Sequence, residues 1–254
     1  MEDFVGIIPA AGNATRLPEL QGSKEIIPVC ALGATMPSHD LARPACLHLM
    51  EAMLLAGISR QIMVLGTGKW DIPAELVSVE AGEPRCAYVV IADSPGVPWT
   101  INAAHSLIRG ANVAMGFPDI LTTRPDLFTR LCDQLTRTDL DVVLAVFPTD
   151  QGHKGDVVSL TGERLVSQIV PKPHEIGAAR VWIAAVWRPS FSEYLHEYLR
   201  KPNVSIRNGR ELYIGDIFNS SIEKLRVGAI DFPLEHFLDI GTPENLDRVR
   251  PRAP

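Results

Sequence analysis

The sequence predicts an α/β fold in which a largely parallel sheet is flanked by helices. Over residues 1–150, short apolar runs alternate with segments that carry a helical apolar stripe or helix-capping residues. Strands and helices that alternate in this way need crossover connections, which join parallel strands. After Phe147 the pattern changes to strand, turn and strand over residues 154–170. We therefore expect one domain with two halves, 1–150 and 151–254, and active groups at the carboxyl ends of the strands.

The first half is expected to contain five strands and three helices. Pro9 should end the ladder pairing of the first strand, because proline has no N–H to donate. The third strand is apolar throughout, as expected where both faces of a strand are covered. Thr100 is a candidate N-cap of the second helix. The expected strands are 4–8, 61–65, 87–92, 112–115 and 141–147, and the expected helices are 44–57, 99–108 and 125–135.

The second half is expected to begin with a strand–turn–strand unit whose turn is Thr161-Gly162. Near the end of the chain, a strand end leads into a helix with Thr242 as its cap and Pro243 as its first residue. The segments between them are expected to be a strand at 181–187, a helix at 191–199, a helix at 211–225 and a strand at 227–232.

The composition excludes several classes of protein. The chain has 46% hydrophobic and 21% charged residues, which is ordinary for a globular protein, and its net charge of −6 argues against a nucleic-acid-binding surface. No apolar run is long enough to span a membrane and no signal peptide precedes the first strand, so we expect a cytoplasmic protein. The four cysteines form no Cys-x-x-Cys pair and should be reduced, and the seven histidines form no zinc motif.

The turn after the first strand is the strongest functional signal. The residues of this turn have small side chains that leave the backbone accessible, so successive backbone N–H groups can converge on a phosphate. Arg16 and Lys24 add a guanidinium fork and a point charge for the same anion. The alternative is an ordinary strand-to-helix turn followed by two solvated cations. The small residues of the turn are Ala10, Ala11, Gly12, Asn13 and Ala14.

Two better-known phosphate motifs are absent from this turn. The dinucleotide fingerprint Gly-x-Gly-x-x-Gly would need glycines where Ala14 and Leu17 stand, which disfavours a nicotinamide-dependent oxidoreductase. A P-loop has the pattern Gly-x4-Gly-Lys-Ser/Thr. Counted from Gly12, its second glycine would stand at position 17, which is Leu17 here.

The stretch instead resembles the signature of the sugar-1-phosphate nucleotidyltransferases, particularly the glucose-1-phosphate thymidylyltransferase branch. That signature is a strand, a Gly-x-Gly-Thr-Arg-Leu turn, and a Pro-Lys or Ser-Lys pair shortly before a Pro-hydrophobic pair. The corresponding segments here are Gly-Asn-Ala-Thr-Arg-Leu at 12–17, Ser23-Lys24 and Pro28-Val29. The resemblance implies a Rossmann-like, mostly parallel mixed sheet flanked by helices, with a small β-containing lobe on the sugar side. Residues 1–150 would bind the nucleotide and residues 151–254 the sugar phosphate.

Two aspartates are the candidate metal ligands. Asp119 and Asp239 each come just past a predicted strand end, although either residue alone is more commonly a turn or capping residue. Mg²⁺ takes oxygen ligands and is usually held by one or two carboxylates plus substrate phosphates. The resemblance implies this role for Pro118-Asp119 and Leu238-Asp239, which match the two metal-binding turns of the family. Asp93 and Asp216 are weaker alternatives.

The resemblance also assigns residues to the two substrates. Lys172 matches the family lysine that binds the phosphate of the sugar 1-phosphate, with a solvated lysine as the alternative. Pro171 replaces the family Glu that grips sugar hydroxyls, which puts glucose in doubt as the sugar. Gly155 matches a glycine that faces the sugar, and Asn102 lies nearest to a base-binding Gln. The implied nucleotide-binding residues are Ala10, Ala11, Gly12, Asn13, Ala14, Thr15, Asn102 and Pro118.

The implied reaction joins a nucleoside triphosphate and a sugar 1-phosphate to give a nucleotide sugar and pyrophosphate. It would be a Mg²⁺-dependent in-line displacement with Arg16, Lys24 and Lys172 as catalytic residues. No general base is needed, because a phosphate monoester is already an anion at neutral pH. The resemblance also implies a homo-oligomer, either a dimer or a tetramer. The alternative is a catalytically inactive protein that binds nucleotide or sugar phosphate on the same fold.

Overall fold

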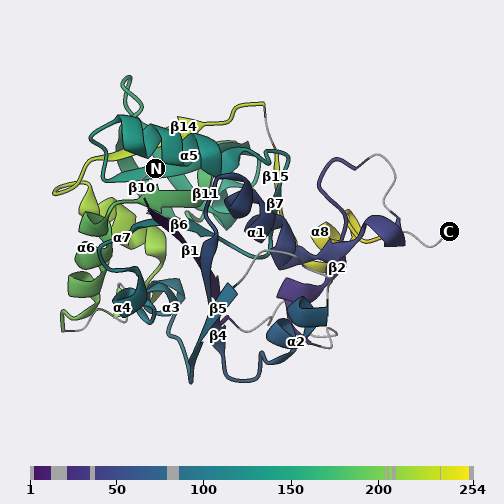
Figure 1. Cartoon of the computed structure of the whole chain (residues 1–254). Helices are drawn as coiled ribbons and strands as arrows, with labels where there is room; N and C mark the ends of the chain where they lie inside the picture. Colours follow the sequence, from purple (N-terminus) through teal and green to yellow (C-terminus); the bar gives the residue numbers. More distant parts are fainter. Residues whose placement is uncertain are drawn as a thin grey trace.

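The computed structural model describes residues 3–12, 22–34, 38–78, 86–202, 204, 206–207, 210–234 and 236–251. Its central element is a nine-stranded sheet with strands from both halves of the chain (Figure 1). Two of the nine strands, β8 (Val142–Thr149) and β14 (Val227–Asp231), pair with each other, and β8 also pairs with β11. The other seven lie in the order β10 (Val166–Pro171), β9 (Asp156–Leu160), β11 (Ala179–Trp187), β6 (Asn112–Gly116), β1 (Phe4–Ala10), β4 (Arg60–Gly66) and β5 (Cys86–Ile91).

The strands of the first half are mostly parallel and those of the second half mostly antiparallel. β1 lies between β4 and β6, and β5 pairs with β4, all in parallel. β11 runs antiparallel to β6, β8 and β9, and β14 pairs with β8 in parallel, so both strands join the two halves. β9 and β10 form the predicted strand–turn–strand unit. The predicted α/β fold with a mixed, largely parallel sheet flanked by helices is confirmed.

Helices cover both faces of the sheet. One buried cluster contains side chains of α3, α6 and α7, namely Ile101, Phe191 and Phe218. The other contains Met50 of α1 and Phe128 of α5. None of the helices in the described ranges is long and apolar enough to cross a membrane. The α-helices are α1 (Ala45–Leu55), α2 (Asp71–Ser78), α3 (Val97–Asn102), α4 (His105–Ile108), α5 (Leu127–Arg137), α6 (Pro189–Leu199), α7 (Ile214–Ser221) and α8 (Pro243–Asp247).

Short elements complete the fold outside the main sheet. Antiparallel two-stranded ribbons join β2 to β3, β7 to β15 and β12 to β13. Their strands are β2 (Pro28–Val29), β3 (Arg43–Pro44), β7 (Ile120–Thr122), β12 (Ile206–Arg207), β13 (Arg210–Glu211) and β15 (Phe237–Asp239). The 3₁₀ turns are η1 (Lys24–Ile26), η2 (His39–Leu41) and η3 (Gly152–Lys154).

Two strand predictions are wrong in detail. β1 continues through Pro9 to Ala10, with Pro9 opposite Val64 of β4. Its pairing with β6 has already stopped at Ile7, so the proline lies where the strand has one neighbour left. β5 is not covered on both faces, because it is the edge of the sheet and its residues are half-buried or exposed.

Two helix predictions are also corrected. The helix expected over 99–108 is two short helices, and Thr100 lies inside α3, buried, with its hydroxyl donating to the carbonyl of Gly96 at 3.3 Å. The helix expected over 211–225 is shorter, because it begins after Tyr213 and ends at Ser221. The cap predicted at Thr242 is confirmed, since its hydroxyl accepts the first-turn N–H of α8.

The cysteines are structural thiols. Cys30, Cys46 and Cys132 are buried, and Cys86 is half-buried, all without disulfides. Burial raises the pKa of Cys46, Cys86 and Cys132 to about 12, so these thiols stay protonated at neutral pH.

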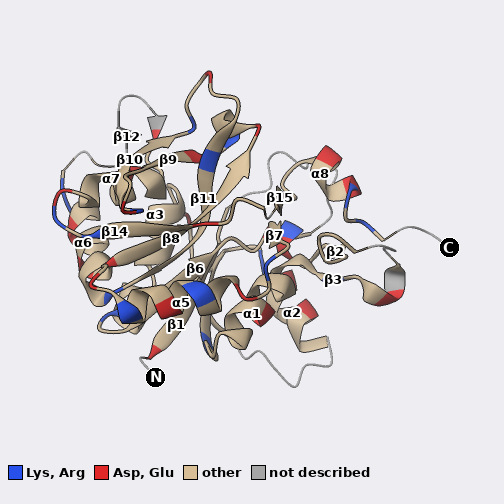
Figure 2. Ribbon diagram, turned by 90° about the horizontal axis from the view of Figure 1, so that it is seen from above, with Lys and Arg blue, Asp and Glu red and all other residues tan. Residues whose placement is uncertain are grey.

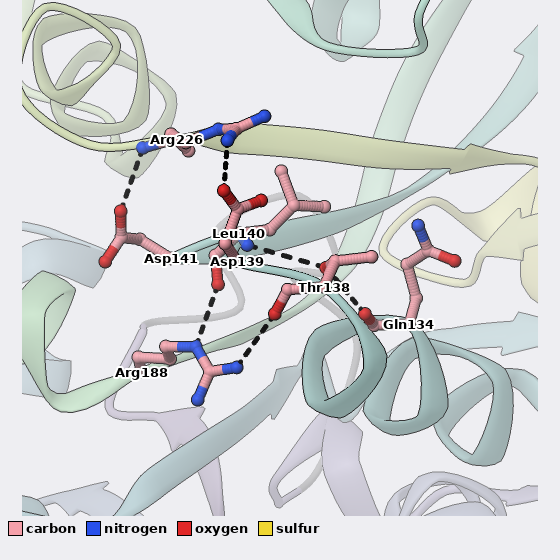
Figure 3. A network of polar contacts seen from close by, with 7 residues as sticks. All are labelled: Gln134, Thr138, Asp139, Leu140, Asp141, Arg188 and Arg226. Carbon is pink, nitrogen blue, oxygen red and sulfur yellow. Dashed lines mark hydrogen bonds and ion pairs between the residues drawn. The ribbon is translucent and has the colours of Figure 1, made fainter.

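A polar network fixes the end of the sheet at which β8 begins and β11 ends (Figure 3). Arg226, before β14, pairs with Asp139, and its backbone N–H donates to the carboxylate of Asp141 at 2.9 Å. Arg188, directly after β11, ties this end of the sheet to the end of α5 through three backbone carbonyls. These belong to Leu135, Thr138 and Leu140, at 2.7, 3.1 and 3.0 Å.

Replacing Arg188 with Ala should destabilise the protein strongly, because three carbonyls lose a charged donor. We expect Arg188→Ala to lower the free energy of unfolding by about 2–4 kcal/mol, measured by urea denaturation. The control is Arg137→Ala on α5, whose side chain is 78% exposed and should contribute less than about 0.5 kcal/mol. Equal stability of the two variants would contradict the structural role of Arg188.

Candidate active site

The candidate site lies at the carboxyl ends of β1 and β6. The chain leaves β1 after Ala10, and Gly12 is exposed, with no atom within 4 Å of the place where a Cβ would stand. The bend is therefore open on this side. Gly66 lets β4 approach it closely, since a Cβ there would lie 3.1 Å from the carbonyl oxygen of Ala11. The predicted residues Asn13, Ala14, Thr15 and Arg16 lie outside the described residues.

Lys24 and Asp119 meet at this site although they are far apart in the sequence. Lys24 begins η1, Asp119 follows β6, and the ammonium group forms an ion pair with Oδ2 of the carboxylate. Both side chains are largely buried, with 18% and 12% exposed. Burial lowers the pKa of Lys24, but the charge and hydrogen bond of Asp119, helped by Glu25 and Asp239, outweigh it. The pKa is therefore raised, and the ammonium group stays charged at neutral pH.

Asp239 is a second carboxylate whose charge acts on Lys24. It ends β15, which pairs with β7 so that Asp239 stands opposite Ile120, the residue after Asp119. The N–H of Ile240 donates to the carbonyl of Asp119 at 3.0 Å, which holds the two backbones together. Figure 2 shows β7 and β15 side by side near α8. Asp119, directly before β7, and Asp239, at the end of β15, thus lie on adjacent backbone segments, as a shared site requires.

Local hydrogen bonds fix the turn that carries Asp239. Its Oδ1 accepts the N–H of Gly241 at 2.7 Å, and its carbonyl accepts the side-chain amide of Asn245 at 2.7 Å. Thr242 then caps α8. The Leu-Asp-Ile-Gly-Thr segment therefore holds the backbone of this aspartate between a strand end and a helix start.

The segment that carries Lys24 is held by Glu25, Lys69 and Asp71, which the sequence analysis did not identify. Glu25, only 1% exposed, pairs with Lys69 at 2.7 Å, and Ser23 donates its N–H and hydroxyl to Asp71 at 2.6 and 2.8 Å. Burial raises the pKa of Glu25, although the charge of Lys69 opposes the shift. The sequence shows only that Ser23 and Glu25 are next to Lys24. No pattern in it connects them with their partners Asp71 and Lys69 near the start of α2.

Asp119 and Asp239 are suited to share a magnesium ion. In the described part of the chain, no group of three or more His, Cys, Asp or Glu side chains could hold a metal alone. Mg²⁺ needs no such group, because one or two carboxylates suffice when water and substrate phosphates complete its octahedron. The two carboxylates therefore fit a magnesium ion whose other ligands are water or bound phosphate oxygens. Asp93 and Asp216, the weaker candidates, accept hydrogen bonds from nearby backbone N–H groups.

Lys172 lies at the same end of the sheet, directly after β10. Its side chain is exposed, and its ammonium nitrogen lies 4.0 Å from the centre of the Tyr213 ring, a cation–π contact. The backbone has a φ of +42°, which is uncommon for a residue with a side chain. Its N–H donates to the carbonyl of Gly155 at 3.0 Å, so a hydrogen bond between the residues that flank β10 and β9 restrains this backbone.

Two other predicted substrate contacts have partners within the protein. A Cβ at Gly155 would lie 2.8 Å from Cγ1 of Val181, so close packing already accounts for glycine at this position. Asn102 lies at the contact between α3 and α6, where its amide oxygen is 2.9 Å from Nδ1 of His196. Pairing of this amide with a nucleobase would compete with that hydrogen bond.

Two cavities lie beside the site. The larger, about 450 Å³, lies between α1 and the segment from Gly116 to Phe128, and the smaller, about 310 Å³, lies between Cys30–Ala34 and residues of the C-terminal segment. Lys24, Asp119 and Asp239 line neither of them.

Comparison with known proteins places the fold. No family model and no curated protein matches the sequence. A solved structure described as a putative glucose-1-phosphate thymidylyltransferase from Bacillus anthracis, in complex with a sucrose, superposes with a TM-score of 0.81. It is 18% identical, and the match covers 96% of this chain and 93% of that one. At this identity the likeness establishes a shared fold.

HddC from Yersinia pseudotuberculosis has the same fold. It matches with a TM-score of 0.70 and 17% identity over 96% of each chain. A second structure of HddC, complexed with GMP-PN, matches with a TM-score of 0.68 and 17% identity over the same shares.

The buried pair of Glu25 and Lys69 makes stability depend on pH. An acid with a raised folded-state pKa contributes stability that is fully present below its unfolded pKa, about 4.5, and is lost as the pH rises through the folded value. We therefore expect the unfolding free energy of the wild type, minus that of Glu25→Gln, to be larger at pH 5 than at pH 8. Urea denaturation at both values measures it. A difference that stays constant or grows with pH would contradict the burial argument.

Proposed function

We propose that this protein is a nucleotidyltransferase that joins a nucleoside triphosphate to a sugar 1-phosphate, with release of pyrophosphate. The observation that carries the proposal is the convergence of Lys24, Asp119 and Asp239 at the carboxyl ends of β1 and β6. These are the groups that a metal-bound triphosphate needs, and they stand beside an open bend of small residues. The fold shared with the thymidylyltransferase-like structure supports the proposal.

The residues of the first half are assigned to the nucleotide. Backbone N–H groups of residues 10–15 and the guanidinium group of Arg16 would hold phosphate oxygens, and Pro118 would border the same space. Lys24 would supply a fixed positive charge whose position is already set by Asp119. Charge that is placed before the reaction needs no reorganisation during it, which is how such groups accelerate transfer.

Lys172 is assigned to the phosphate of the second substrate. Its ammonium group is exposed at the same end of the sheet, on a backbone fixed by Gly155. A phosphate monoester is already an anion, so the chain needs to orient this nucleophile and not to deprotonate it. A magnesium ion held by Asp119 and Asp239 would neutralise the developing charge on the phosphates.

The proposal is tested by a matrix of nucleoside triphosphates against sugar 1-phosphates, scored by pyrophosphate release with and without magnesium. Release that needs a specific pair of substrates and the metal supports the proposal. Tight nucleotide binding without release for any pair would show an inactive binding protein on the same fold. The homo-oligomer and the cytoplasmic location remain part of the proposal, and sedimentation of the purified chain tests the first.

Removing either carboxylate should abolish turnover without unfolding the protein. We expect Asp119→Asn and Asp239→Asn each to reduce pyrophosphate release at least about 100-fold, because each variant removes a negative oxygen ligand. The matched control is Asp133→Asn on α5, whose side chain is 58% exposed. If the control and the two variants turn over alike, the aspartates do not form the proposed metal site.

Replacing Arg16 with Ala should affect turnover far more than stability. The guanidinium group is expected to bind phosphate, so we predict a fall in pyrophosphate release of about 100-fold or more, with little change in the thermal midpoint. Parallel kinetic and thermal measurements check this. Wild-type turnover by the variant would count against the assignment of the turn.

A further inference from the structure

Asp156 is an acidic side chain at the site that no sequence motif singled out. It is the first residue of β9 and stands opposite Pro171 of β10, the residue before Lys172. β11 extends past the end of β6, because Ala184 pairs with Gly116, the last residue of β6. Val181, nearer the start of β11, pairs with Val157. Asp156 therefore lies beyond the carboxyl end of β6, and Asp119 follows that same strand end.

The structure fixes the carboxylate of Asp156 in one place. Its Oδ2 accepts the indole N–H of Trp182 at 3.2 Å, and Trp182 packs on Phe117 with the ring centres 5.7 Å apart. Phe117 lies just before Pro118-Asp119, so a short chain of contacts connects Asp156 with the proposed nucleotide site. A half-buried carboxylate held in this way is an oriented hydrogen-bond acceptor.

Gly215 makes room for this carboxylate. A Cβ at Gly215 would lie 2.2 Å from Oδ2 of Asp156, a distance that no side chain could tolerate. Gly215 is in the first turn of α7, where the partial positive charge of a helix start favours an anion. The start of the helix thus favours a carboxylate at this position.

Opposite charges flank the start of α7. The ammonium group of Lys172 lies over the ring of Tyr213, the N-cap residue of α7, while the carboxylate of Asp156 lies against Gly215. A sugar phosphate also has two chemically different ends, an anionic phosphate and a set of hydroxyl donors. The carboxylate repels the phosphate and accepts hydroxyls, so the pair can bind such a molecule in only one direction.

We propose that Asp156 is a specificity-determining residue that accepts a hydrogen bond from a hydroxyl of the sugar 1-phosphate, whose phosphate lies at Lys172. The inference rests on the proposed function for the identity of this substrate. It adds the direction in which the substrate lies and the side chain that distinguishes one sugar from another. A site built to bond a hydroxyl rejects an analogue that lacks it.

The test is direct binding, measured by calorimetry, of glucose, galactose and mannose 1-phosphates and of their singly deoxygenated analogues. In the wild type, removal of the contacted hydroxyl should weaken binding about 10- to 100-fold. In Asp156→Asn the parent sugar phosphate should be weakened, and loss of that same hydroxyl should cost little more. Inorganic phosphate, which probes the Lys172 end, should bind Asp156→Asn at least as tightly as the wild type.

Two glycine variants provide a second, independent test. Gly215→Ala should displace the carboxylate and reproduce the loss seen for Asp156→Asn. Gly162→Ala, in the turn between β9 and β10, is the matched control, since nothing lies within 4 Å of its Cβ position. The inference is overturned if Asp156→Asn binds the parent like the wild type, if every analogue loses affinity equally, or if the wild type binds none of the sugar phosphates.

Failure of the proposed function has a different signature. Sugar phosphate binding that depends on Asp156, without pyrophosphate release from any nucleoside triphosphate, would contradict the proposed reaction and still support the role of Asp156. Pyrophosphate release with sugar selectivity that Asp156→Asn leaves unchanged would keep the reaction and remove the inference.

Discussion

The ion pair between Lys24 and Asp119 is the interaction on which the site depends. Taking two charges out of water is costly, and a close partner offsets that cost only when the geometry is good. The pair is largely buried, so each residue offsets part of the desolvation cost of the other. It also crosses a long stretch of sequence, because Lys24 and Asp119 are 95 residues apart. The fold and the charge distribution of the site are therefore coupled.

The surroundings of the pair explain why the lysine side is well fixed. Glu25, next to Lys24, is buried and paired with Lys69. The short turn η1 therefore supplies the cation of one ion pair and the anion of another. The carboxylates of Asp119 and Asp239 both favour the charged lysine. When an anionic substrate and a cation enter together, Lys24 can bind the anion from its position beside Asp119 while the carboxylates bind the cation, so each buried charge has an opposite partner.

Local pattern predicted the sheet and its order of elements, but not the contacts between remote side chains. β1, β4 and β6 are short apolar runs, and their periodicity was sufficient to find them. Asp119 and Asp239 could be paired only through a family resemblance, since each alone is an ordinary turn residue. The pairing of Glu25 with Lys69 and that of Asp156 with Trp182 leave no trace in spacing. α3 and α4 both pack against α6, and their separation into two helices could not be read from local propensity.

The place of β11 in the sheet also bears on how the chain is made. Among the described strands, β8 pairs with β11 and β14, and both follow it in the sequence. During synthesis from the N-terminus, β8 therefore emerges as an apolar strand with no partner, and β6 emerges with one free edge. Unpaired strand edges promote aggregation, so the nascent chain passes through a vulnerable interval that closes only when β11 has been translated.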